Sequence, residues 1–277
     1  MPLARAKNSP AGGSGNDLKP SRNPARARAR RLHTVQGTVP GYHRNRPLKE
    51  RSMAEHHFIP VTTDRTGAPT PDAEAARQVV LVTGATGRIG AATARELAAQ
   101  GHHVVLGARR IERLVLLAAE IRAAGGSVEC HVLDVTDADD AQTFALAAFH
   151  RHGRVDALVN AAGVAAPSRL DALKLLEWDR MLDVNVRGAL YAIAAVLPLM
   201  QRAGVGHVVN LASGTGIGPA HAVQGASARA LLAIAEALRQ EERDIEVSVI
   251  APDMPGGAQA VAEAIGAVLA REAHACA

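Results

Sequence analysis

The chain has 277 residues, of which 48% are hydrophobic and 21% charged, a composition typical of a soluble globular protein with one or two domains and a sizeable core. The 2% of aromatic residues argues against the stacking platforms of single-strand nucleic-acid binders, and no apolar run approaches the roughly 18 residues that span a bilayer, so we predict no membrane span. The two cysteines, Cys130 and Cys276, form neither a metal-ligand spacing nor a disulfide framework, which predicts no metal site and a cytoplasmic location.

The net charge of +4 is distributed unevenly along the chain. Residues 1–52 hold 12 Lys and Arg against Asp17 and Glu50, a net charge of +10. The remaining 225 residues hold 19 basic and 25 acidic side chains, a net charge of −6. The basic character therefore belongs to the N-terminal segment, and the acidic body argues against nucleic acid as a partner.

We expect residues 1–52 to be disordered, because this Pro-, Gly- and Arg-rich segment cannot bury enough apolar surface to offset its ordering entropy. A basic arm for a polyanion and a targeting peptide are two open interpretations. The interpretation that we favour is an over-extended start, with Met53 as the initiator. Residues 53–76 lack periodicity and form a linker, so the sequence predicts a basic extension and linker over 1–76 and one folded domain over 77–277.

From Gln78 onward, short apolar runs alternate with segments of helical period. We expect strands over residues 79–82, 104–106, 128–133, 157–160, 207–211 and 246–250. We expect helices over residues 88–100, 111–124, 138–150, about 181–203, about 226–242 and about 258–271. Strands that alternate with helices predict an α/β fold, a single Rossmann-type domain with a doubly wound parallel sheet.

A glycine-rich turn, Thr83–Gly90, joins the first expected strand to the first expected helix. Glycines permit a tight turn and a close backbone approach, so a pyrophosphate can lie against the free N–H groups of the helix N-terminus. Glycines alone are a weak signal, but their place after the first strand of a repeating strand–helix pattern makes it strong.

Four further segments follow the glycine turn in the chain. They are Asp134 within Leu133–Asp137, then Asn160–Gly163, then Trp178–Arg180 leading to Asn185, and finally Val208–Ser213. Together with the glycine turn, these segments resemble the short-chain dehydrogenase/reductase family over about residues 78–252. The turn departs slightly from the pattern of that family, because Arg88 stands where its middle glycine is usual.

The resemblance implies a nicotinamide nucleotide as cofactor. It implies that the pyrophosphate is held by Gly84, Gly87, Ile89 and Gly90. Asp134 would accept a hydrogen bond from the adenine amine beside Val135, and the ribose and nicotinamide would be lined by Asn160, Ala161 and Gly163.

The end of the second strand decides between NAD and NADP in this family. An acidic residue there would hold the ribose 2′-hydroxyl, but this chain has Ala108-Arg109-Arg110. Arg109 can pair bidentately with a 2′-phosphate, and Arg88 is placed to assist, although either arginine could instead be a solvated surface charge. We therefore expect NADP(H) as the preferred cofactor, with NAD(H) possible.

The family's catalytic pattern is incomplete in this sequence. The resemblance implies Ser213 as the serine that polarises the carbonyl and Asn185 as the asparagine that supports a proton relay. Gln224 and Ala228 stand at the tyrosine and lysine positions, and neither an amide nor a methyl group can supply a proton near neutral pH. His221 is an alternative acid or an exposed loop histidine, while Tyr191 fits a packing role better.

The C-terminal part also departs from the family. Asp253 replaces the glycine of the Pro-Gly turn that follows the last expected strand, and the helix near residue 258 comes almost at once. We therefore expect a truncated C-terminal substrate region, with most of the lid and the final strand missing.

Two functions are compatible with this pattern. The first is an oxidoreductase that moves hydride between NADP(H) and a small carbonyl or alcohol substrate, with a degraded catalytic site. The alternative is a catalytically inactive nucleotide-binding protein that acts as a regulatory or oligomerising partner. In either case the Ala- and Leu-rich helices near 181–203 and 226–242 predict a homo-oligomer.

Overall fold

The computed structural model describes residues 77–212 and 218–273, and side chains up to residue 270. The expectations for residues 1–76 therefore lie outside the described residues. The strands are β1 Val79–Thr83, β2 His103–Ala108, β3 Ser127–Val132, β4 Ala157–Asn160, β5 Gly206–Leu211 and β6 Ile245–Ile250. The helices are α2 Arg88–Ala99, α3 Ile111–Ala123, α4 Ala138–His152, α5 Leu175–Leu182, α6 Gly188–Ala203, α7 Ala222–Glu241 and α8 Gly257–Ala273, with a short 3₁₀ turn at Leu170–Ala172.

The six strands form one parallel sheet in the order β3-β2-β1-β4-β5-β6. The order reverses between β1 and β4, which makes the sheet doubly wound and confirms the Rossmann-type α/β fold expected from the sequence. The central strand β1 is buried along its whole length, as its unbroken apolar run requires when helices cover both faces. Val80 is in register with Val104 of β2 and with Ala157 of β4.

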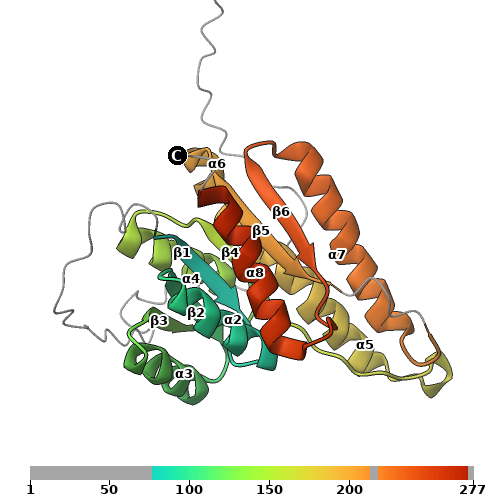
Figure 1. Cartoon of the computed structure of the whole chain (residues 1–277). Helices are drawn as coiled ribbons and strands as arrows, with labels where there is room; N and C mark the ends of the chain where they lie inside the picture. Colours follow the sequence, from blue (N-terminus) through green and yellow to red (C-terminus); the bar gives the residue numbers. More distant parts are fainter. Residues whose placement is uncertain (1–76, 213–217, 274–277) are drawn as a thin grey trace, which may run out of the picture. The chain divides into compact units, whose positions relative to one another are not determined.

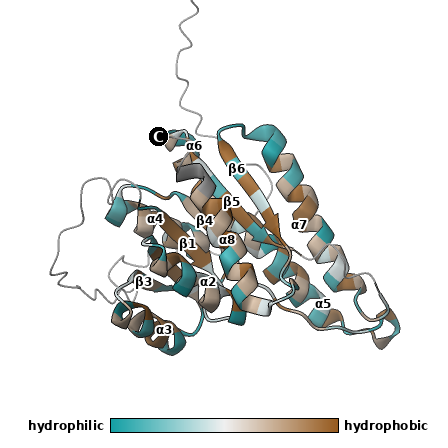
Figure 2. Ribbon diagram, in the orientation of Figure 1, coloured by the Kyte–Doolittle hydropathy of each residue, from teal (hydrophilic) through white to brown (hydrophobic). Residues whose placement is uncertain are grey.

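Helices cover both faces of the sheet (Figure 1). On one face α4, α6 and α7 pack against apolar side chains such as Leu81, Leu158 and Val208. On the other face α2, α3 and α8 pack against a second cluster that includes Val82 and Leu106. Figure 2 shows the strands as the most hydrophobic layer, with hydrophilic residues on the outer sides of the helices. The two cores hold the carboxyl ends of the strands in fixed relative positions.

Two helices begin earlier than the sequence predicts. The helix expected near Met181 begins at Leu175 as α5 and runs into α6 through a π-helical turn, Asp183–Arg187. Leu175, Trp178 and Met181 recur at helical spacing, so the sequence carries a signal for the earlier start although the first turn of α5 is largely exposed. Helix α7 begins at Ala222 instead of Ala226, which places Gln224 inside its first turn.

One continuous helical segment among the described residues, Leu175–Ala203, is long and apolar enough by length and composition to cross a membrane. This is weak evidence for a span, because core helices of soluble proteins pass the same test. Ile193, Val196 and Met200 of this segment are buried against the sheet. Other apolar residues of the segment, such as Leu175 and Leu176, are exposed.

Candidate functional site

The glycine turn between β1 and α2 is built for close backbone approach. Gly84 has a positive φ of 63°, and a Cβ atom there would lie 2.5 Å from the Cα of Ala162. Gly87 donates its N–H to the Gly84 carbonyl at 2.8 Å and precedes α2. No described side chain caps this helix, and its first turn carries no acidic residue, so its N–H groups are available to an anion.

A cavity of about 240 Å³ opens beside this turn. Its walls come from the ends of β1 to β4 and from the segments that follow them, where ligands bind in doubly wound sheets. Seven of the residues singled out from the sequence line it together: Gly84, Gly87, Arg109, Asp134, Val135, Ala161 and Gly163. The structure therefore brings most of the expected nucleotide-binding residues around one cavity.

The other four candidates for cofactor binding do not line this cavity. Arg88 is exposed at the first position of α2, and the partly buried Ile89 packs against the core under that helix. Gly90 allows α2 to approach the turn, because a Cβ atom would lie 2.5 Å from the Gly84 carbonyl oxygen. Asn160 is buried, and its Nδ2 donates to Oδ1 of Asn210 at 2.9 Å, which ties β4 to β5.

The lining also contains residues that the sequence reasoning missed. They are Thr86, Ala108, Arg110, Leu133, Ala162, Val164 and Val184. Arg110 follows Arg109 directly, so the basic pair was a visible signal. Apart from Thr86, the others have small or apolar side chains that give no functional signal in the sequence. Only the fold shows that they lie at the cavity.

Charge at the cavity is divided between two arginines and one carboxylate. Arg109 and Arg110 are both exposed at the end of β2. Asp134, after β3, is the one carboxylate among the described lining residues. Its Oδ1 accepts hydrogen bonds from the Thr136 N–H at 3.0 Å and the Thr136 hydroxyl at 2.8 Å, which fixes the orientation of the carboxylate.

Asn185 lies in the π-helical turn beside the cavity and uses its whole amide for internal hydrogen bonds. Its Oδ1 accepts from the Val164 N–H at 2.8 Å, and its Nδ2 donates to the Val164 carbonyl at 2.9 Å and to the Ser227 hydroxyl at 3.2 Å. The amide therefore joins the segment after β4 to α7. Ser213, the expected partner of Asn185 in catalysis, lies outside the described residues.

Gln224 and Ala228 are one helical turn apart on α7 and therefore share a face of this helix. Gln224 is half-buried, and its main-chain carbonyl accepts the hydroxyl of the buried Ser227 at 2.8 Å. Ala228 is buried. Among the described residues the only tyrosine is Tyr191, which packs against the core, and the only lysine is Lys174, which pairs with Glu177 on α5.

His221, considered above as a substitute acid, precedes α7 directly. Its Nδ1 lies 3.0 Å from the Pro219 carbonyl oxygen, which holds the ring near the start of the helix. The residue is half-buried, so it is neither a fully exposed loop histidine nor part of the cavity lining.

The fold and this cavity define the chain as a Rossmann-type α/β protein with a glycine turn at the strand order reversal. The family model described as short chain dehydrogenase matches residues 78–263, and the chain belongs to this family. Over 181 residues it is 39% identical to an uncharacterized oxidoreductase of Staphylococcus saprophyticus, covering 63% of this chain and 73% of that protein.

Two solved structures illustrate the likeness. A metagenomic short-chain oxidoreductase in complex with NADP has a TM-score of 0.64 and 36% identity, over 70% of this chain and 90% of the other. An NAD⁺-bound xylitol dehydrogenase has a TM-score of 0.61 and 32% identity, over 63% of this chain and 69% of the other. Relatives of this fold therefore bind both forms of the nicotinamide nucleotide.

Proposed function

We propose that the chain binds a nicotinamide nucleotide in the cavity beside the glycine turn and prefers NADP(H), with NAD(H) as the weaker ligand. The observation that carries this proposal is the pair Arg109 and Arg110, which line the cavity at the end of β2. Guanidinium groups match the charge and geometry of a 2′-phosphate, whereas a 2′-hydroxyl is best held by a carboxylate.

The residues present fit the rest of the nucleotide. A Cβ at Gly84 would collide with the backbone at Ala162, so this close approach between the turn and β4 requires glycine. The uncapped N-terminus of α2 would hold the pyrophosphate, and Asp134 would accept the adenine amine. Ala161 and Gly163 would line the ribose and nicotinamide side.

The nicotinamide ring, when bound, supplies or accepts a hydride, and the protein must supply the proton and position the substrate. Gln224 and Ala228 replace the groups that this family uses for proton transfer, and the Asn185 amide is engaged by Val164 and Ser227. We infer that reduction of a small carbonyl substrate, or oxidation of an alcohol, is slow or absent. General acid catalysis contributes about 10²–10⁴-fold to such rates.

The second candidate function is that of a catalytically inactive nucleotide-binding protein, which acts as a regulatory or oligomerising partner. The same pair, Gln224 and Ala228, favours it, because loss of both groups leaves the cavity able to hold a nucleotide without general acid chemistry. In both functions we infer a homo-oligomer in the cytoplasm, with no nucleic-acid partner.

The experiment that tests these proposals uses the full chain. Isothermal titration with NADPH and NADH would give both affinities, and consumption of NADPH across a panel of aldehydes and ketones would give turnover. We expect NADPH to bind more tightly than NADH and turnover to be absent or slow. Equal affinities would refute the NADP(H) preference, and no binding of either would refute the nucleotide site. Turnover equal to that of ordinary reductases would refute the degraded site.

A further inference from the structure

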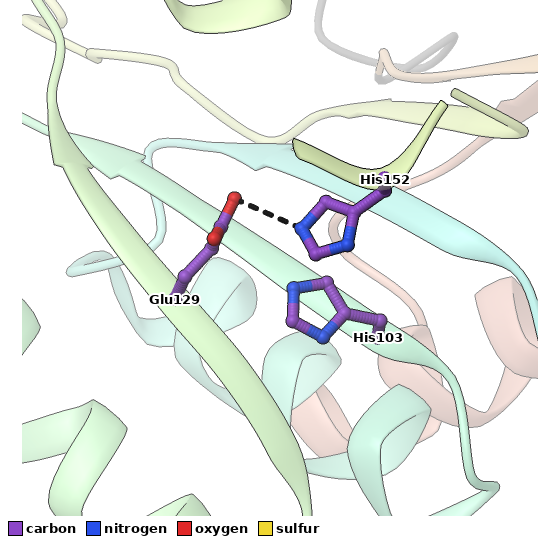
Figure 3. Close-up of side chains that lie close together, drawn as sticks. All are labelled: His103, Glu129 and His152. Carbon is purple, nitrogen blue, oxygen red and sulfur yellow. Dashed lines mark ion pairs between the residues drawn. The ribbon is translucent and has the colours of Figure 1, made fainter. Parts of the chain in front are cut away.

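Three side chains with metal-binding atoms meet on the α4 side of the sheet. His103 begins β2, Glu129 lies in β3, and His152 ends α4, and their ligand atoms all lie within 4.8 Å of one another. Nε2 of His152 is 3.3 Å from Oε1 of Glu129, and the two imidazole rings have centroids 4.1 Å apart. Figure 3 shows both rings beside the Glu129 carboxylate.

The sheet register explains why residues far apart in the sequence meet here. His103 is paired with Ser127 in the parallel β2–β3 ladder, and Glu129 lies two positions further along β3. Side chains two positions apart in a strand point to the same face, so His103 and Glu129 emerge side by side. Helix α4 packs on this face and brings His152 over them at its C-terminal end.

The donor atoms lie near the spacing that a metal ion requires, and small side-chain movements would bring all three to it. Nδ1 of His103 lies 2.7 Å from Ser127 Oγ and 3.4 Å from Nη2 of Arg77. When Nδ1 donates to Ser127, the shorter of the two contacts, Nε2 presents its lone pair, and this buried atom has no hydrogen-bond partner among the described residues. Ligand atoms on a tetrahedral zinc ion are about 3.4 Å apart, close to the 3.3 Å between His152 and Glu129.

Two of the three side chains have pKa values shifted from their ordinary range. Desolvation lowers the pKa of His103 to about 4, so its imidazole is neutral. Burial alone would raise the pKa of Glu129, but hydrogen bonds and charge from His131 and His152 outweigh it and hold this pKa below its ordinary value. A neutral imidazole and an ionised carboxylate are the forms that bind metals.

We propose that His103, Glu129 and His152 form a binding site for a divalent transition-metal ion, with zinc as the reference ion. Two imidazole nitrogens and one carboxylate oxygen are a ligand set that such ions prefer over Mg²⁺ or Ca²⁺. None of the three residues lines the nucleotide cavity, so the site is separate from it. A metal here would join the edge strand β3 and its neighbour β2 to the end of α4.

Arg151 limits how tightly the ion is held. Its Nε lies 3.2 Å from Oε2 of Glu129, whereas Oε1 faces Nε2 of His152 at 3.3 Å and Nε2 of His131 at 3.4 Å. The side chain of Arg151 is 40% exposed and can turn toward solvent when a cation enters. We therefore expect a dissociation constant in the micromolar range, and Arg151→Gln should tighten binding.

The test uses the full chain without an affinity tag, treated with a chelator and titrated with ZnCl₂ at pH 7.5 by calorimetry. The chain carries twelve histidines, so the number of bound zinc ions is compared between variants. His152→Gln should lose one equivalent of zinc. His150→Gln is the matched control, because His150 is exposed on the same helix and should bind zinc as the parent does.

Thermal unfolding supplies a second measurement. At a zinc concentration 100-fold above the dissociation constant, the melting temperature of the parent should rise by about 5–10 °C, and that of His152→Gln should not. A folded Glu129→Gln variant should show the same missing rise in melting temperature as His152→Gln. If Glu129→Gln does not fold, His152→Gln alone tests the metal site. Equal zinc binding by the parent and His152→Gln, or no binding by either, would overturn the proposal.

Discussion

Replacing Arg109 by alanine should weaken NADPH binding while leaving NADH binding nearly unchanged. The 2′-phosphate is the only group that distinguishes the two ligands, and Arg109 lines the cavity at the end of β2, where that group would lie. The affinity ratio of NADPH to NADH therefore isolates the contribution of this side chain, because effects on the shared part of the nucleotide cancel.

The magnitude follows from the exposure of the side chain. A charge-assisted hydrogen bond contributes about 1.5–3 kcal/mol, but Arg109 is exposed, and solvent screening reduces such pairs toward about 1 kcal/mol. We therefore expect the ratio to fall by about 1–2 kcal/mol, or roughly 5- to 30-fold. Arg109→Asp should reverse the preference, since it puts a carboxylate where the 2′-hydroxyl of NADH can be held.

The assay is isothermal titration of both nucleotides at constant salt, because exposed charge pairs weaken as ionic strength rises. Arg113→Ala is the matched control, since Arg113 is an exposed arginine on α3 that does not line the cavity. An Arg109→Ala ratio equal to that of Arg113→Ala would refute the assignment of Arg109 to the 2′-phosphate.

Three further predictions concern the glycine turn, the N-terminal segment and the catalytic pair. Gly84→Ala should abolish measurable nucleotide binding and lower the melting temperature, because its Cβ would lie 2.5 Å from backbone at a positive φ of 63°; calorimetry and thermal unfolding check this. A chain that begins at Met53 should keep the melting temperature and NADPH affinity of the full chain, and a large loss of either would show that residues 1–52 contribute to the fold. Gln224→Tyr combined with Ala228→Lys should raise any residual NADPH-dependent rate, measured by absorbance, and an unchanged rate would show that proton transfer is not what limits it.

The sheet and most of its helices could be predicted from the sequence because the pattern of apolar residues determines both. In β1, four consecutive buried apolar residues and the buried Thr83 mark a strand covered on both faces, and regular alternation with helices sets the parallel order. Helix starts were harder to predict. The small residues at the start of α7 give no apolar period, so its first turn is hard to predict. The first turn of α5 does carry apolar residues at helical spacing, but Leu175 and Leu176 remain exposed instead of joining the core.

The nucleotide cavity was predictable only where backbone geometry demands a particular residue. Gly84 is visible in the sequence because its positive φ and its 2.5 Å approach to the backbone of Ala162 leave no room for a Cβ atom. By contrast, Ala162 and Val184 line the cavity with ordinary apolar side chains. The cluster of His103, Glu129 and His152 shows the same limit, because it depends on strand register and helix packing, which no local spacing encodes.

The structure also shows how α7 packs with Gln224 and Ala228 at the positions where the family resemblance implies the tyrosine and the lysine. Ala228 is buried on α7, where a small apolar side chain satisfies the packing, and Gln224 leaves the first turn of the helix intact. Asn185 still ties the segment after β4 to Ser227 of the same helix through its amide. The Asn185–Ser227 hydrogen bond that holds α7 to the segment after β4 does not use the side chains at positions 224 and 228, so substitutions there leave this bond in place. For this reason we expect Gln224→Tyr with Ala228→Lys to affect stability mainly through the lysine, whose charge must reach the cavity or remain buried at a cost of several kcal/mol.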